Sequence, residues 1–165
     1  MVIVYLGKET NRILEIMDSL SLPYRVVGDR QKGIPMKELL KTKQTSSGKG
    51  NGFLYLYKEP ETNQQMLADA LKKEEIFIPR VAVNTENNIN WTLGYLMEIV
   101  EQEYEYYALK EKIYDIITHP DKVRLKADPF YRKRMVHAYS LLEDPETTLE
   151  QLRECYIQIK SSKLL

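Results

Sequence analysis

The sequence predicts an α/β fold of three layers: a four-stranded, mostly parallel sheet in the order 2-1-3-4, followed by a C-terminal helical extension. Two observations predict this class. Over positions 1–100, short apolar runs alternate with stretches of helical spacing, which is typical of βαβ units. Over positions 101–165, every apolar pattern has helical spacing. We therefore expect an α/β domain at 1–100 and a helical extension at 101–165 that packs on this domain or on a partner.

Four segments have the composition of strands: 2–6, 24–27, 53–57 and 79–83. The first is almost wholly apolar and ends at Gly7, as expected of a strand that is buried on both faces. Pro79 can only open the fourth strand, because proline has no amide hydrogen to donate to a neighbouring strand. The fourth strand is therefore compatible with an edge of the sheet.

Helices are expected at 8–20, 35–40, 61–73, 91–118, 129–143 and from 147 onward. The long helix ends at His119-Pro120, since proline cannot continue a helix. Thr147 and Glu150 have the spacing of a capping box at the start of the last helix. The segment 41–52 has no apolar residue and is expected to form a mobile surface loop. No internal repeat is visible in the sequence.

Composition excludes several classes of protein. Twenty-four basic and 24 acidic residues give a formal net charge of zero, which argues against a protein that coats nucleic acid or an anionic membrane. The single cysteine, Cys155, cannot form an internal disulfide. The apolar N-terminus lacks the pattern of a signal peptide, and no window is long and apolar enough to span a membrane. We therefore expect a cytoplasmic protein.

Familiar catalytic motifs are incomplete. Gly48-Lys49 is followed by Gly50 rather than Ser or Thr, and the loop leads into a strand, so it is not a Walker phosphate-binding loop. Receiver-type phosphotransfer needs acidic residues after the first and third strands, where the chain has Lys8-Glu9 and Lys58-Glu59. No Cys-x-x-Cys pair and no His/Cys cluster is present. The sequence therefore predicts no catalytic residue, no metal site and no cofactor.

The ends of the predicted strands are the candidate ligand site. In a parallel sheet the loops after all four strands open on one edge, where open α/β sheets bind ligands. Helix N-termini at that edge offer N–H groups to an anion. The residues that we predict for such a site are Lys8, Thr10, Asp29, Lys58, Asn84, Thr85, Asn88, Asn90 and Trp91. The alternative is that these polar side chains cap helices and turns.

A motif surrounds the tryptophan. Val81-Ala82-Val83 is followed by Thr85-Glu86, Asn88, Asn90 and Trp91-Thr92. This pattern resembles the bacterial domain of unknown function 3783 over this segment, and more loosely over the preceding α/β units. The family has no assigned activity, so the resemblance implies fold rather than function. Because Asn favours turns and helix caps, the motif is either a rigid strand-to-helix corner or a binding corner.

A second resemblance lies at 119–146. His119-Pro120-Asp121-Lys122 resembles the loop of J-domain co-chaperones, and Ala138-Tyr139 with Asp144-Pro145-Glu146 resembles the end of that domain's third helix. The helix before this loop is acidic, however, where the J-domain helix is basic, and the family's opening Tyr-x-x-Leu-Gly-Val segment is missing. The resemblance implies a co-chaperone, and the alternative is a helix that simply ends at proline.

Charge is segregated in the helical extension. Its basic residues, interleaved with aromatic ones, are Lys122, Arg124, Lys126, Arg132, Lys133 and Arg134. Such a patch can bind nucleic acid, but the Glu-rich helix before it can neutralise it, or it can form a protein interface. We predict a non-catalytic regulatory or protein-interaction module whose helices bind protein, either a second copy in a dimer or another chain. The alternatives are a small-anion or nucleotide-binding protein, including an enzyme, at the strand ends, and a J-domain-like co-chaperone.

Overall fold

The computed structural model describes residues 1–7, 11–43 and 47–161. The chain forms two compact units, Met1–Glu101 and Gln102–Leu165. The N-terminal unit has two apolar clusters, one on each face of its sheet. The C-terminal unit has an apolar cluster of its own.

The N-terminal unit is built on a four-stranded sheet in the order β2-β1-β3-β4, which confirms the predicted order. Its strands are β1 (Val2–Tyr5), β2 (Tyr24–Val27), β3 (Phe53–Leu56) and β4 (Val81–Val83). The outer pairs, β1 with β2 and β3 with β4, are parallel. The central pair, β1 with β3, is antiparallel, so the mostly parallel sheet is mixed.

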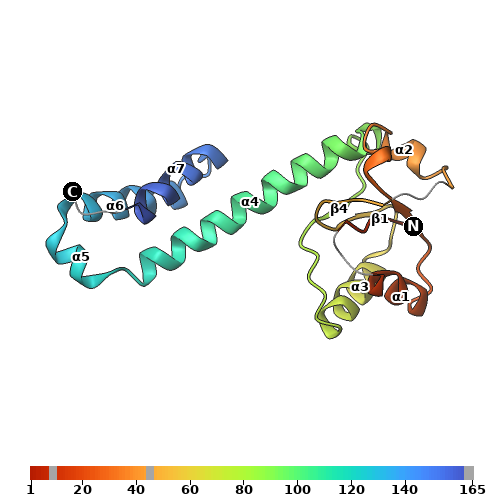
Figure 1. The fold of residues 1–165 in the computed structure, drawn as a ribbon, viewed down its shortest axis with the longest axis horizontal. Helices are drawn as coiled ribbons and strands as arrows, with labels where there is room; N and C mark the ends of the chain where they lie inside the picture. Colours follow the sequence, from red (N-terminus) through yellow and green to blue (C-terminus); the bar gives the residue numbers. More distant parts are fainter. Residues whose placement is uncertain (8–10, 44–46, 162–165) are drawn as a thin grey trace. The chain divides into compact units, whose positions relative to one another are not determined.

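Helices cover both faces of this sheet, which gives the three predicted layers. Helices α1 (Arg12–Ser19) and α3 (Glu61–Lys73) lie on one face (Figure 1). Helix α2 (Met36–Leu39) and the first turns of α4 (Leu93–Thr118) pack on the other. Helix α1 connects the parallel strands β1 and β2, and helix α3 connects the parallel strands β3 and β4. These two βαβ units run in opposite directions, because β1 and β3 are antiparallel. A half-turn about an axis perpendicular to the sheet relates such units, so right-handed crossovers place both helices on one face.

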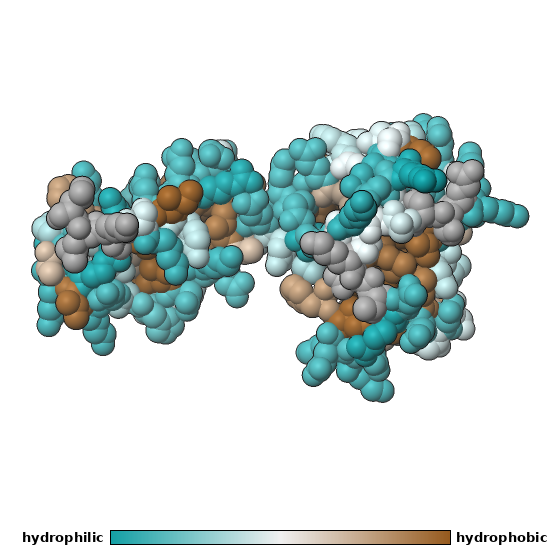
Figure 2. Space-filling model, in the orientation of Figure 1, coloured by the Kyte–Doolittle hydropathy of each residue, from teal (hydrophilic) through white to brown (hydrophobic). Residues whose placement is uncertain are grey.

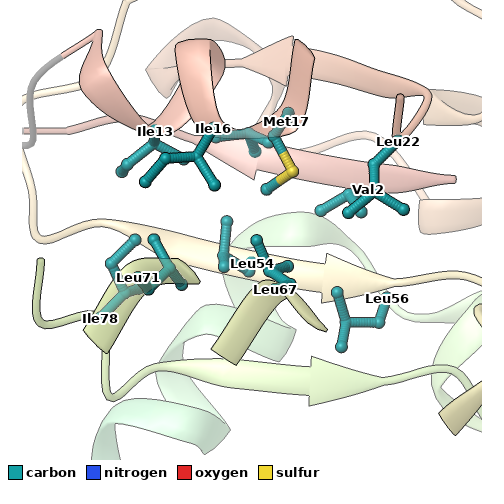
Figure 3. Packing of buried hydrophobic residues seen from close by; sticks show 11 residues of the cluster. Val2, Ile13, Ile16, Met17, Leu22, Leu54, Leu56, Leu67, Leu71 and Ile78 are labelled. Atoms are coloured by element: carbon teal, nitrogen blue, oxygen red, sulfur yellow. The ribbon is translucent and has the colours of Figure 1, made fainter. Parts of the chain in front are cut away.

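The core beneath α1 and α3 follows from the alternation of side chains along the strands. Val2, Val4, Leu54 and Leu56 point to this face, because side chains in a strand alternate between faces. Figure 3 shows the side chains of both helices converging on them; these are Ile13, Ile16, Met17, Leu67 and Leu71. Burying one such aliphatic side chain stabilises the fold by about 1.5–3 kcal/mol.

The N-terminal unit contains a structural repeat that the sequence does not reveal. Gly28 N donates to Gln31 Oε1 (2.9 Å), and Thr85 N donates to Asn88 Oδ1 (2.8 Å). The two halves meet where Met36 N donates to Trp91 O and Leu93 N donates to Ile34 O. Residues at matching places in the two halves are separated by the same number of sequence positions. The matching pairs are Tyr24 with Val81, Gln31 with Asn88, Pro35 with Thr92, Met36 with Leu93 and Leu39 with Leu96. The two edge strands, β2 and β4, are therefore equivalent positions.

The C-terminal unit is a bundle of the second half of α4 with α5 (Lys122–Ala127), α6 (Pro129–Glu143) and α7 (Leu149–Lys160). Leu109 and Ile113 of α4 pack there against side chains of α6 and α7. Asp121 caps α5 and Asp128 caps α6, each accepting two backbone N–H bonds. Helix α5 was not predicted.

The start of α7 differs from the prediction by one residue. The capping box is formed by Thr148 with Gln151, not by Thr147 with Glu150. Thr147 is buried, and its hydroxyl donates to Leu141 O (2.7 Å). The more buried threonine therefore joins α6 to the turn, and its neighbour caps the helix.

Candidate functional site

The antiparallel central pair divides the predicted strand-end site between two edges of the sheet. Asp29 follows β2 at the edge where β1 and β2 end. The residues that follow β3 and β4 lie at the opposite edge: Lys58, Asn84, Thr85, Asn88, Asn90 and Trp91. Lys8 and Thr10 lie outside the described residues. The prediction that all nine share one edge is wrong, because β1 and β3 run in opposite directions.

At the first edge, Asp29 organises the glycine-rich loop. Tyr5 Oη donates to Asp29 Oδ1 (2.6 Å), Lys49 N donates to Oδ2 (3.0 Å), and Lys32 Nζ lies 2.8 Å from Oδ1. Gly50 N in turn donates to Tyr5 Oη (3.1 Å). These contacts hold part of the loop that was predicted to be mobile. They also place a paired carboxylate at this edge.

The Asp29 network predicts a pH-dependent loop. The bonds from Lys32 and Tyr5 lower the pKa of Asp29 to about 2 from its ordinary 3.8. Because the folded-state pKa is depressed, the stabilisation is complete above the ordinary pKa and is lost as pH falls through about 2. We expect the Lys49 and Gly50 amide resonances to titrate with that midpoint in NMR spectra. An Asp29→Asn variant should show no such titration, and a wild-type midpoint near 4 would contradict the network.

At the second edge, Asn88 is a buried structural link. Its Oδ1 accepts from Tyr55 Oη (3.0 Å) and from Thr85 N (2.8 Å). Its Nδ2 donates to Val83 O (3.0 Å). Burial raises the pKa of Tyr55 to about 12, so its hydroxyl remains a donor at neutral pH. The Asn88 side chain thus joins β3, the end of β4 and the turn that follows it.

The neighbouring predicted residues also make contacts within the fold. Asn84 Oδ1 accepts from the amide of Lys58, whose φ is +50° (2.6 Å). Asn90 accepts from Lys37 Nζ (3.1 Å). The Trp91 ring packs edge-to-face on Tyr95, with ring centroids 5.1 Å apart. The described geometry of this corner is that of a strand-to-helix connection.

The remaining chemistry of the described residues is sparse. No group of three or more His, Cys, Asp or Glu side chains within 1–7, 11–43 and 47–161 could hold a metal ion. Cys155 is buried, and burial raises the pKa of its thiol, which disfavours the reactive thiolate. Among the helices in the described parts of the chain, none combines the length and apolar character needed to cross a bilayer.

An apolar groove opens between α3 and the strands β3 and β4. Its volume is about 430 Å³. Leu54 and Leu56 form the floor, and Leu67 and Leu71 form the wall on α3. Phe77 lines the groove with 73% of its surface exposed. The polar side chains in the lining are Gln64, Lys72 and Glu75.

The strand beside this groove is an open edge. Among the strands of the described residues, β4 pairs with β3 alone, and its Val81 and Val83 are 40% and 46% exposed. At the equivalent edge, Tyr24 of β2 packs against the core, and the charged Arg25 follows it. Natural sheets protect their edges with charges or bulky covers, and β4 carries no charged residue. Figure 2 shows hydrophobic side chains at the surface of the N-terminal unit.

Sequence reasoning missed this groove. The sequence predicts a strand here that is compatible with an edge, but whether α3 covers the strand depends on packing that the sequence does not display. One signal for the groove was present in the sequence. The apolar Phe77 lies close to Pro79, and proline is typical of edge strands.

Comparison with known proteins identifies one family. Residues 62–107 match the family model described as "Domain of unknown function (DUF3783)". No curated protein matches the chain, and no solved structure matches it. The matched segment contains α3, β4, the Asn-rich corner and the first half of α4. The segment 62–107 is therefore similar to the domain of unknown function 3783, and this similarity includes the motif around Trp91.

Proposed function

We propose that the N-terminal unit is a non-catalytic protein-interaction module that binds an extended polypeptide segment along β4. The observation that carries the proposal is the apolar groove of about 430 Å³ beside an uncharged edge strand. We also propose a cytoplasmic setting, which suits a chain whose single cysteine cannot form an internal disulfide.

The open edge supplies the affinity. A partner strand that pairs with β4 extends the sheet and forms main-chain hydrogen bonds, which is the mode called β-augmentation. Its side chains alternate between the two faces. Those on the face of Val81 and Leu54 enter the groove, because the paired residues Leu54 and Val81 share that face.

The groove supplies the selectivity. Its floor and wall are leucines, so aliphatic side chains at every second position of the partner fit it best. The equivalent position in the first half of the unit has Tyr24, which packs on the core. Val81 is smaller, and the groove beside it stays open. The partner that we propose is therefore an extended segment with an aliphatic residue at every second position. None of the residues on the side that faces the groove is charged.

The test uses peptides selected from a random phage-displayed library on the immobilised full chain, then synthesised with a fluorescent label. We expect selected peptides to carry aliphatic residues at alternate positions. Val81→Lys puts a charge at the groove, and Val81→Tyr fills it as Tyr24 does in the other half. Each should weaken binding by at least about tenfold in fluorescence polarisation, or about 1.4 kcal/mol.

Met66→Lys is the matched control. Met66 is 46% exposed on α3 and does not line the groove. Binding should survive this change, and all three variants should keep the wild-type circular dichroism spectrum. The proposal would be contradicted if both Val81 variants bound the peptides as tightly as the wild-type chain does. Selected peptides without alternating aliphatic residues would also contradict it.

Two other functions stay predictions. A J-domain-like role is favoured by one observation: the exposed His119 and the cap residue Asp121 form a surface turn between α4 and α5. A small-anion or nucleotide site is less favoured, because the Asp29 carboxylate occupies the first edge. At the second edge, the Lys58 ammonium lies over the Tyr57 ring, 5.4 Å from its centroid.

A further inference from the structure

In the C-terminal unit, the basic segment 122–134 follows the Glu-rich helix α4. Among the described residues, no salt bridge joins the basic segment 122–134 to α4. Helix α4 instead pairs Glu105 with Arg153 of α7 (2.6 Å). Arg132 donates to two backbone carbonyls at the end of α5, and Arg134 donates to one in α7. The sequence left two main alternatives for this segment, neutralisation by α4 or a protein interface. Among the described residues these two arginines bond to carbonyls and not to α4, which favours the interface.

The exposed side of α4 within this unit is acidic and aromatic. Glu103, Tyr107, Glu111 and Tyr114 recur at spacings of three and four residues, which places them on one face of the helix. All four are exposed, and the two tyrosines are each more than half exposed. Lys110 lies on the same face, and its ammonium lies over the Tyr106 ring, 5.4 Å from the centroid. The buried side of the same helix, with Leu109 and Ile113, faces the bundle core.

The exposed side of α5 and α6 is basic and apolar. Lys126, Arg132 and Lys133 are exposed there. Val136 and Tyr139 of α6 are each more than half exposed. Glu143, four residues after Tyr139, is an exposed acidic residue at the end of this face. The buried sides of α4 and α6 belong to one core cluster. One unit thus presents an acidic-aromatic helix face and a basic-apolar helix face on two helices that share a core.

We propose that this unit binds a second copy of the chain, with α4 of each copy against α5 and α6 of the other. Charge complementarity selects this occupant: the acidic face of one copy meets the basic face of its partner, and two-fold symmetry repeats the contact. The exposed tyrosines and Val136 supply apolar area at its centre. A purely acidic partner would satisfy the basic face and leave the tyrosine-bearing face of α4 exposed.

The test is sedimentation equilibrium of the full chain over micromolar to submillimolar concentrations. We expect a dimer of twice 19.4 kDa that weakens as salt screens the charges. Two charge-reversed chains should be monomeric: Glu103→Lys with Glu111→Lys, and Lys126→Glu with Lys133→Glu. Mixing them should restore a heterodimer, because each reversed face then meets its complement.

The rescue separates an interface from a folding defect, since a misfolded unit would not recover on mixing. A wild-type chain that stays monomeric, a reversed chain that still forms dimers, or a mixture without heterodimers would each overturn the proposal. Val81→Lys serves as an independent control, because a dimer through the helices should persist in that variant.

Discussion

Replacing Gly48 by alanine is expected to destabilise the N-terminal unit by about 1–3 kcal/mol, the usual cost of forcing extra atoms into a packed site. A Cβ atom at Gly48 would lie 2.2 Å from Cζ of the Tyr5 ring. That ring is fully buried, and its hydroxyl is held by Asp29 and Gly50. The ring cannot move aside, so the loop must shift and lose those bonds.

Gly33→Ala is the matched control, because a Cβ atom there would have no neighbour within 4 Å. This change should be neutral or slightly stabilising, since alanine reduces the freedom of the unfolded chain. Fluorescence of Trp91, the single tryptophan, follows urea unfolding of the unit that contains both glycines. If the two variants unfolded at the same urea midpoint, the loop would not pack against Tyr5 in solution.

Asn88→Ala is expected to cost about 2–4 kcal/mol of unfolding free energy. The change removes three hydrogen bonds at once, and each buried group that loses its partner costs about 1–3 kcal/mol. The groups left without that partner are Tyr55 Oη, Thr85 N and Val83 O. The effect should exceed that of any single surface change in the same turn.

Asn87→Ala provides the comparison, because Asn87 is exposed and its side chain makes no capping hydrogen bond. Its effect should stay within about 0.5 kcal/mol. Cys155, the single cysteine, lies in the core of the other unit, so thiol labelling reports on that unit separately. We expect Asn88→Ala to leave this labelling slow, and rapid labelling would show that the change also opens the C-terminal unit.

The sequence predicted those elements whose pattern is long or whose ends are marked. Helix α3 spans 61–73 as expected, because Pro60 precedes it and its apolar spacing is regular. Helix α6 spans 129–143, with Pro129 in its first turn and the Asp128 cap before it. The six-residue α5 was missed, since its apolar pattern is too short to separate from a loop.

The antiparallel pairing of β1 and β3 could not be predicted from local patterns. The connection between β2 and β3 contains the short α2 and a polar loop. Nothing in that composition distinguishes a parallel crossover from a return in the other direction. This single reversal separated Asp29 from Asn88 and divided the predicted site between two edges. The groove is also a product of packing, because the exposure of Val81 depends on how far α3 extends over β4.

Hydrogen exchange of the amides in β4, with and without a selected peptide, tests the central claim most directly. We expect slower exchange in the segment 77–84 of the complex, because a partner strand would bond to the open edge of β4 and cover the groove. The same peptide should leave the exchange of β2 and of the C-terminal helices unchanged. Slower exchange only in those helices or in β2, with no change in β4, would contradict the claim that the partner binds along β4.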